Sequence, residues 1–141
     1  MRFMMLMIPK GYEKAEAGTM PDPKRVAEMM KYNESLQKAG VLLALDGLHP
    51  PSMGARVSFT GGKPTITDGP FTEAKEVVGG YWMIQVKSKA EALEWASRCP
   101  GSDNEVIEVR QVQEFADFPA DVQDAAAGFS GMQSGAGSKT P

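Results

Sequence analysis

The chain has 141 residues, of which 42% are hydrophobic and 23% charged, a composition typical of a soluble globular domain. One cysteine and one histidine exclude an internal disulfide and a zinc site built from several Cys and His ligands. A net charge of −3 without runs of like charge disfavours nucleic-acid binding. No apolar stretch approaches the ~20 residues of a membrane span, and residues 3–8 are too short for a signal-peptide core of ~7–15 residues. We therefore expect a cytoplasmic protein with no membrane association, bound metal or other cofactor.

The first predicted elements are a strand and a helix. Residues 2–8 are almost continuously apolar, which is typical of a strand covered on both faces. A helix is predicted over residues 23–39, because Asp22 is an N-cap acceptor, Pro23 suits the first helical position and Gly40 provides a stop. The stripe expected to face the core comprises Val26, Met29, Met30, Asn33 and Leu36.

A short strand and a hairpin follow. Residues 41–45 form an apolar strand that leads into the corner His49-Pro50-Pro51. Residues 56–60 and 63–67 alternate in polarity on either side of Gly61-Gly62, which predicts a β-hairpin with a two-residue turn.

The second half repeats the pattern of strand, helix and strand. Residues 81–86 are again almost continuously apolar. Ser88 and Glu91 fit a capping box for a helix that ends at Arg98, and residues 105–112 predict the last strand. Cys99 lies at this helix end without a basic cluster, which disfavours a thiolate nucleophile.

The order β-α-β-hairpin-β-α-β over residues 1–118 is the split β-α-β pattern of ferredoxin-like α+β folds. Residues 119–141 are rich in Ala, Gly and Ser and predict a flexible C-terminal tail. The two strands assigned to the centre of the sheet are apolar on both faces, and the helices cover only one face. We expect a second copy to cover the other face in a homodimer; the alternative is that the hairpin and the tail cover it within one chain.

The densest polar cluster lies between the hairpin and the strand at residues 81–86, and reads Asp68-Gly69-Pro70-Phe71-Thr72-Glu73-Ala74-Lys75-Glu76. Asp-Gly-Pro predicts a turn, and the charges after it suit either a solvated loop or a recognition surface. The segment resembles the signature of the DGPF family, DGPFAETKE, at all positions except Thr72 and Ala74. Further segments that look like the family's pattern lie at residues 48–57, 79–81, 91–96 and 108–110.

This bacterial family is part of the YCII-related superfamily. The resemblance implies a ferredoxin-like fold that associates as a dimeric α/β barrel. The family's biochemical role is largely unestablished, and many members are encoded beside extracytoplasmic-function sigma factors. This implies an alternative function, a non-catalytic accessory protein of such a sigma factor. The His-Asp pair proposed as catalytic near the first helix of YCII proteins cannot be carried over, because the first histidine here is His49.

The candidate catalytic residues are His49 and Asp68. Histidine is the usual general base near neutral pH. Asp46 and Ser52 are close to His49 in sequence, and Asp68 can meet it across the turns. The alternative for His49 is a loop side chain that caps a backbone carbonyl.

The candidate ligand-binding residues are Glu73, Lys75, Glu76, Tyr81, Glu108 and Arg110. Glu108 and Arg110 lie opposite the core-facing residues of their strand, so we expect them between the two sheets of a dimer. There an Arg fork can hold a carboxylate or enolate while a nearby carboxylate moves protons. These residues predict binding of a small anionic molecule with cofactor-free isomerase-like or lyase-like chemistry. An ion-pair network that fixes dimer register, with Tyr81 as aromatic core, is the alternative, so the sequence leaves open whether the protein is an enzyme.

Overall fold

The computed structural model describes residues 1–135, which divide into two compact units after Gln111. The first unit contains six strands, two α-helices and two short 3-10 helices. In chain order these are β1 (Arg2–Ile8), η1 (Tyr12–Lys14), α1 (Pro23–Lys38), β2 (Leu42–Gly47), η2 (Pro51–Met53), β3 (Ala55–Thr60), β4 (Lys63–Asp68), β5 (Gly80–Gln85), α2 (Lys89–Ser97) and β6 (Val106–Gln111).

The main sheet is antiparallel, with the strand order β2-β5-β1-β6. The first and third core strands, β1 and β5, are therefore central, as the split β-α-β pattern predicts. The fold is α+β. The sheet of a single chain is open, with β2 and β6 as its edges, so no barrel closes within the chain.

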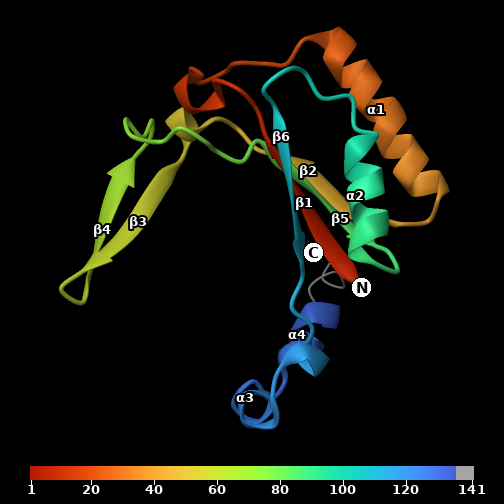
Figure 1. The fold of residues 1–141 in the computed structure, drawn as a ribbon. Helices are drawn as coiled ribbons and strands as arrows, with labels where there is room; N and C mark the ends of the chain where they lie inside the picture. Colours follow the sequence, from red (N-terminus) through yellow and green to blue (C-terminus); the bar gives the residue numbers. More distant parts are fainter. Residues whose placement is uncertain (136–141) are drawn as a thin grey trace. The chain divides into compact units, whose positions relative to one another are not determined.

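The helices α1 and α2 cover one face of this sheet (Figure 1). On that face, alternate residues of β1 and β5 are buried, and Phe3, Met5 and Ile84 are at most 2% exposed. Trp82 packs edge-on against Tyr32 of α1, with ring centroids 5.7 Å apart. Its indole Nε1 donates to the Asn33 side-chain oxygen at 2.8 Å. The central strands therefore bury one face within the chain.

The other face of the sheet carries two cross-strand rows. Asp46, Tyr81, Leu6 and Glu108 form one row, and Ala44, Met83, Met4 and Arg110 form the next. We call these eight residues the open face. Their central members on β1 and β5 are half-buried, whereas the members on the edge strands are exposed.

The helix boundaries follow the predicted caps, with one correction to the buried stripe of α1. The Asp22 carboxylate accepts from the Lys24 amide at 3.1 Å, and Gly40 has the positive φ of a helix stop. Val26 and Met30 are 42% and 50% exposed, so their predicted core positions are wrong. The buried stripe instead runs through Met29, Tyr32, Asn33 and Leu36, because the ring of Tyr32 packs on Trp82 and its hydroxyl donates to the Trp95 carbonyl.

The predicted capping box of α2 forms in part. The Glu91 amide donates to the Ser88 hydroxyl at 3.1 Å, as expected. The Glu91 carboxylate accepts from the Lys87 amide at 2.9 Å, one residue before the donor that the motif predicts.

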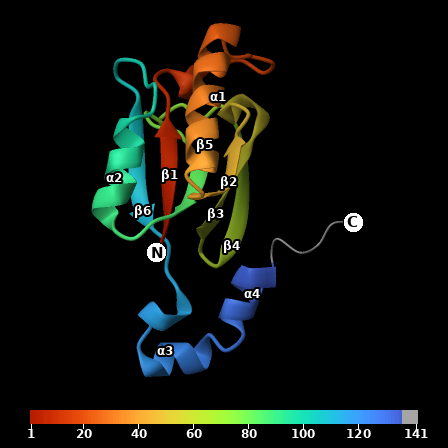
Figure 2. The same cartoon turned by 90° about the vertical axis from the view of Figure 1, so that its right-hand side faces the viewer.

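The β3–β4 hairpin confirms the prediction of two strands joined at Gly61-Gly62, both of which have positive φ. It stands on the side of the sheet opposite α1 and α2 in both views (Figures 1 and 2). Every residue of β3 and β4 is exposed, so the hairpin does not cover the open face within the chain.

The second unit starts at Val112 and contains η3 (Phe115–Asp117), α3 (Ala120–Ala125) and α4 (Phe129–Gly135). The rings of Phe118 and Phe129 lie 5.8 Å apart, and the Gln133 side chain donates to the Gln113 carbonyl. The segment predicted as a flexible tail therefore forms short helices up to residue 135, and the rest of that prediction, residues 136–141, lies outside the described residues. Over residues 1–135, no helix combines the length and apolar character that a bilayer crossing requires.

Candidate functional site

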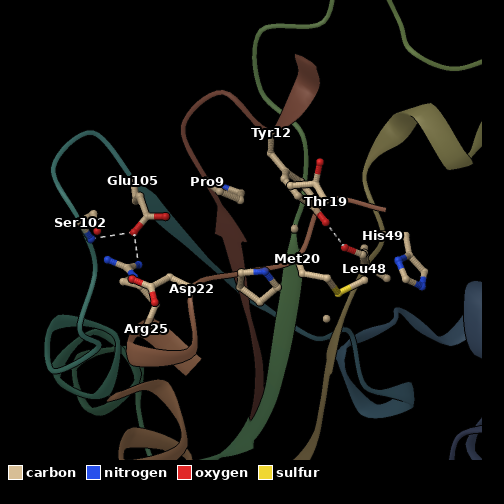
Figure 3. Close-up of a pocket in the computed structure, with 13 residues that line it drawn as sticks. Pro9, Tyr12, Thr19, Met20, Asp22, Arg25, Leu48, His49, Ser102 and Glu105 are labelled. Carbon is tan, nitrogen blue, oxygen red and sulfur yellow. Dashed lines mark hydrogen bonds and ion pairs between the residues drawn. The ribbon is translucent and has the colours of Figure 1, made fainter. Parts of the chain in front are cut away.

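The first unit contains a cavity of about 550 Å³ where several chain segments meet (Figure 3). It lies between the segment that follows β1, the start of α1, the loop after β2, and the residues just before β5 and β6. Its lining residues are Pro9, Tyr12, Thr19, Met20, Pro21, Asp22, Arg25, Gly47, Leu48, His49, Gly79, Ser102 and Glu105. The volume and the mixture of many apolar groups with a few polar groups are typical of small-molecule sites.

An ion pair forms one wall of the cavity. Arg25, in the first turn of α1, places Nη2 2.8 Å from Glu105 Oε1, and the Ser102 amide donates to the same oxygen at 2.6 Å. The Glu105 side chain is 15% exposed and that of Arg25 is 35% exposed. One guanidinium nitrogen is therefore committed to Glu105, which leaves the other donors of the fork for a further partner.

Tyr12 and His49 lie at the opposite wall (Figure 3). The Tyr12 hydroxyl donates to the Leu48 carbonyl at 2.5 Å, and burial raises the pKa of this phenol. Gly79 lets the backbone before β5 lie close to Pro9, because a Cβ at this position would lie 2.6 Å from Pro9 Cγ. The exposed imidazole of His49 stands at the rim of the cavity.

The predicted partners of His49 are engaged elsewhere. The Asp46 carboxylate accepts from the Tyr81 hydroxyl at 2.7 Å, and the Ser52 hydroxyl donates to the Ala15 carbonyl. Asp68 ends β4 and does not line the cavity. Within residues 1–135, the structure therefore joins His49 neither to these side chains nor to a backbone carbonyl.

The predicted ligand-binding residues lie in two other places. Glu73, Lys75 and Glu76 are exposed in the loop that follows β4. Tyr81, Glu108 and Arg110 belong to the open face, as expected for the side of β6 opposite Ile107 and Val109. Over the described part of the chain, no salt bridge links these charged residues. One chain thus does not gather them into a single site.

The Asp68–Phe71 segment forms the base of the hairpin. The Gly69 amide donates to the Gly54 carbonyl at 2.9 Å, and a Cβ on Gly69 would lie 1.7 Å from the Pro51 carbonyl oxygen. The Gly69-Pro70 peptide is cis, and the guanidinium of Arg56 lies 4.0 Å from the ring centre of Phe71. The uncharged members of the motif therefore fix the hairpin to the turn at residues 51–54.

The sequence analysis missed Tyr12, Asp22, Arg25 and Glu105 as cavity residues. One signal was present for Arg25: a cation in the first turn of a helix opposes the helix dipole and therefore calls for an acidic partner. The position of that partner, 80 residues away, depends on the tertiary fold.

Two further chemistries receive no support from the described residues. Residues 1–135 contain no group of three or more His, Cys, Asp or Glu that could hold a metal ion. Burial raises the pKa of the Cys99 thiol to about 11, so this side chain is not a thiolate at neutral pH.

Comparison with known proteins gives the family. The model of the YCII-related domain matches residues 1–116, which include the sheet, both core helices and every cavity residue. The chain is also 29% identical over 75 residues to an uncharacterized protein of Rhizobium meliloti (strain 1021). This match covers 53% of the chain and 60% of that protein, so the shared region is only part of the curated relative. The chain belongs to the family of YCII-related domain proteins.

Proposed function

We propose that this protein binds a small organic anion in the cavity beside Arg25. The observation that carries the proposal is the Arg25–Glu105 pair in the wall of an otherwise largely apolar cavity. Glu105 holds the guanidinium in one orientation, so little rotamer freedom is left to lose when a carboxylate binds to the remaining donors. The apolar side chains of Pro9, Met20 and Leu48 provide a surface for the body of the ligand.

The acidic residues of the cavity are both engaged within the chain. Asp22 and Glu105 are the acidic lining residues, but Asp22 accepts from the first turn of α1, where the helix dipole offsets its charge. Glu105 is neutralised by Arg25. The charged lining residues thus carry a formal charge of −1, and a carboxylate would be held by the directed donors of the Arg25 guanidinium, not by a net positive charge. This proposal places the anion site at Arg25 in place of Arg110.

We propose His49 as the proton-transfer group of an isomerase-like or lyase-like activity in this cavity. It is the histidine at the rim, across from the ion pair (Figure 3). A carboxylate held at Arg25 leaves the adjacent carbon of the ligand between the two walls. The measurement is exchange of that carbon's hydrogen for deuterium in D₂O, followed by NMR. Exchange that His49→Gln abolishes supports this role, whereas the absence of exchange in the wild type contradicts it.

We propose that the protein is a homodimer of the DGPF branch of the family, joined through the open face. Half-buried apolar side chains lie at the centre of this face, and charged residues lie at its edges. This arrangement is typical of interfaces between copies, and two open faces packed together would make the barrel. The specific packing of Gly69 and Phe71 gives a reason for the DGPF signature.

Isothermal titration with a panel of small carboxylic acids, and with their amides and amines, tests the anion site. We expect binding of acids to the wild type and a loss of on the order of 10-fold or more in affinity for Arg25→Gln. Arg110→Gln, a matched change on the open face, should retain the wild-type affinity for the acid. Preference for amines, or equal losses for the two variants, would contradict the site at Arg25.

A further inference from the structure

The β3–β4 hairpin, which we call the arm (residues 55–68), has one apolar face. Val57 pairs with Ile66 and Phe59 pairs with Pro64, so these side chains lie on the same side of the two-stranded ribbon. Val57, Phe59 and Ile66 are 54%, 77% and 72% exposed. The alternate positions Ser58, Thr65 and Thr67 form a polar face. The arm thus has the pattern of a hairpin with one buried side, although no residue of the first unit covers that side.

An isolated two-stranded hairpin is at best marginally stable in water. Within the first unit, the arm is supported at its base, through the Gly69–Gly54 hydrogen bond and the Arg56–Phe71 contact. These contacts set the direction of the arm without burying its apolar face. An element that is fixed at its base and uncovered along its length is suited to contact with another molecule.

We propose that the apolar face of the arm packs against a second copy of this chain, at the flank of its open face. The inference rests on the proposed homodimer and adds the element that holds it together. The arm stands on the same side of the sheet as the open face, opposite the helices (Figures 1 and 2). A copy that docks on the open face therefore comes within reach of the arm.

The exposed area favours a second copy. The three apolar side chains expose on the order of 300 Å² per arm, whereas a standard interface buries ~800 Å² on each partner. The arm alone is too small for a stable complex. It adds to the apolar centre of the open face, formed by Met4, Leu6, Tyr81 and Met83, and a two-fold arrangement of two copies buries both patches on each copy at the same time.

The test is the dimer dissociation constant, measured by sedimentation equilibrium on the full chain. For Phe59→Ser/Ile66→Ser we expect an increase on the order of 100-fold or more, because two large apolar contacts are lost in each copy. The matched control Ser58→Ala/Thr65→Ala changes the polar face of the same arm and should dissociate like the wild type. Near-ultraviolet circular dichroism of Trp82, in the core, checks that each variant is folded.

A photo-cross-linking residue at position 59 identifies the surface that the arm contacts. In a mixture of ¹⁴N and ¹⁵N chains, we expect mixed-isotope cross-links to residues on or beside the open face. Cross-links within one chain, or only between two arms, would overturn the proposal. A wild-type dimer that Phe59→Ser/Ile66→Ser leaves intact would overturn the role of the arm and leave the homodimer standing. A wild-type monomer would overturn the homodimer itself.

Discussion

The substitution Gly69→Ala tests whether the DGPF segment acts through backbone packing. Gly69 has no side chain, and its amide donates to the Gly54 carbonyl at 2.9 Å. A Cβ at this position would lie 1.7 Å from the Pro51 carbonyl oxygen and 2.5 Å from the carbonyl carbon. Both atoms belong to the backbone, so a change of side-chain rotamer cannot relieve the overlap. Either the turn at residues 51–54 or the base of the arm has to move.

The magnitude follows from that contact. Inserting a methyl group into a packed site costs about 1–3 kcal/mol, and a displaced Gly69–Gly54 hydrogen bond adds about 1 kcal/mol. For a chain of this size, each kcal/mol lowers Tm by about 2–4 °C, so a loss of about 2–4 kcal/mol should lower Tm by about 4–16 °C. Hydrogen exchange should show the loss of protection first in β3 and β4, because the perturbed contacts lie at their base.

The thermal unfolding and hydrogen exchange of Gly69→Ala are compared with those of a control variant, Gly101→Ala. Gly101 is also a loop glycine, but a Cβ there meets nothing within 4 Å and its φ is not positive. This control should stay within about 0.5 kcal/mol of the wild type. If Gly69→Ala and Gly101→Ala unfold alike, or if β3 and β4 keep their protection, the packing explanation of the motif is wrong.

Three further predictions concern the core and the open face. Asn33→Leu removes the acceptor of the buried Trp82 indole, so we expect a loss of about 1–3 kcal/mol in urea unfolding, and an unchanged midpoint would contradict it. Asp46→Ala should lower the pKa of Tyr81, because the hydrogen bond to Asp46 is what raises it most; the tyrosinate absorbance on alkaline titration measures the shift. Burial raises the pKa of the Cys99 thiol to about 11 in the folded chain, from an ordinary value of 9.0. The buried, protonated thiol therefore adds on the order of 2 kcal/mol to the free energy of unfolding below pH 9. This stabilisation disappears as the pH rises to 11. The loss between pH 8 and pH 11 should be smaller for Cys99→Ala than for the wild type, and equal losses would refute the assignment.

The order of the core elements could be predicted because each boundary has a local cause. Asp22, Pro23 and Gly40 define α1 by capping geometry, and Gly61-Gly62 defines the hairpin by its positive φ. The face of a helix that is buried depends instead on which neighbours it meets. Tyr32 was not predicted in the core because it lies off the stripe that starts at Val26, whereas Trp82 and the Trp95 carbonyl provide partners for both its ring and its hydroxyl.

The cavity was harder to predict than the fold, because its walls come from segments that are distant in sequence. His49 could be found as the only histidine in the chain. Arg25 and Glu105 have ordinary local contexts, a helix start and a loop, and become a site only where the fold brings them together at 2.8 Å. The helices at residues 120–125 and 129–135 were missed for another reason: the composition of the segment indicates that it lacks a large core, but it does not forbid short helices.

The sequence analysis assigned ligand binding to the charged residues of the Asp68–Glu76 segment. In the structure, the best-defined contacts of this segment are made by its uncharged residues. Gly69 lies against the Pro51 carbonyl where no side chain fits, and Phe71 lies under the Arg56 guanidinium at the start of the arm. A position that requires the absence of a Cβ restricts sequence more strongly than an exposed carboxylate, which tolerates replacement by any polar group. We therefore propose that the segment holds the arm at one angle, and that recognition of a ligand depends on the separate cavity at Arg25. If so, substitutions of Glu73 and Lys75 should leave both the ligand affinity and the dimer dissociation constant unchanged. A strong effect of either substitution would show that the charged loop takes part in binding.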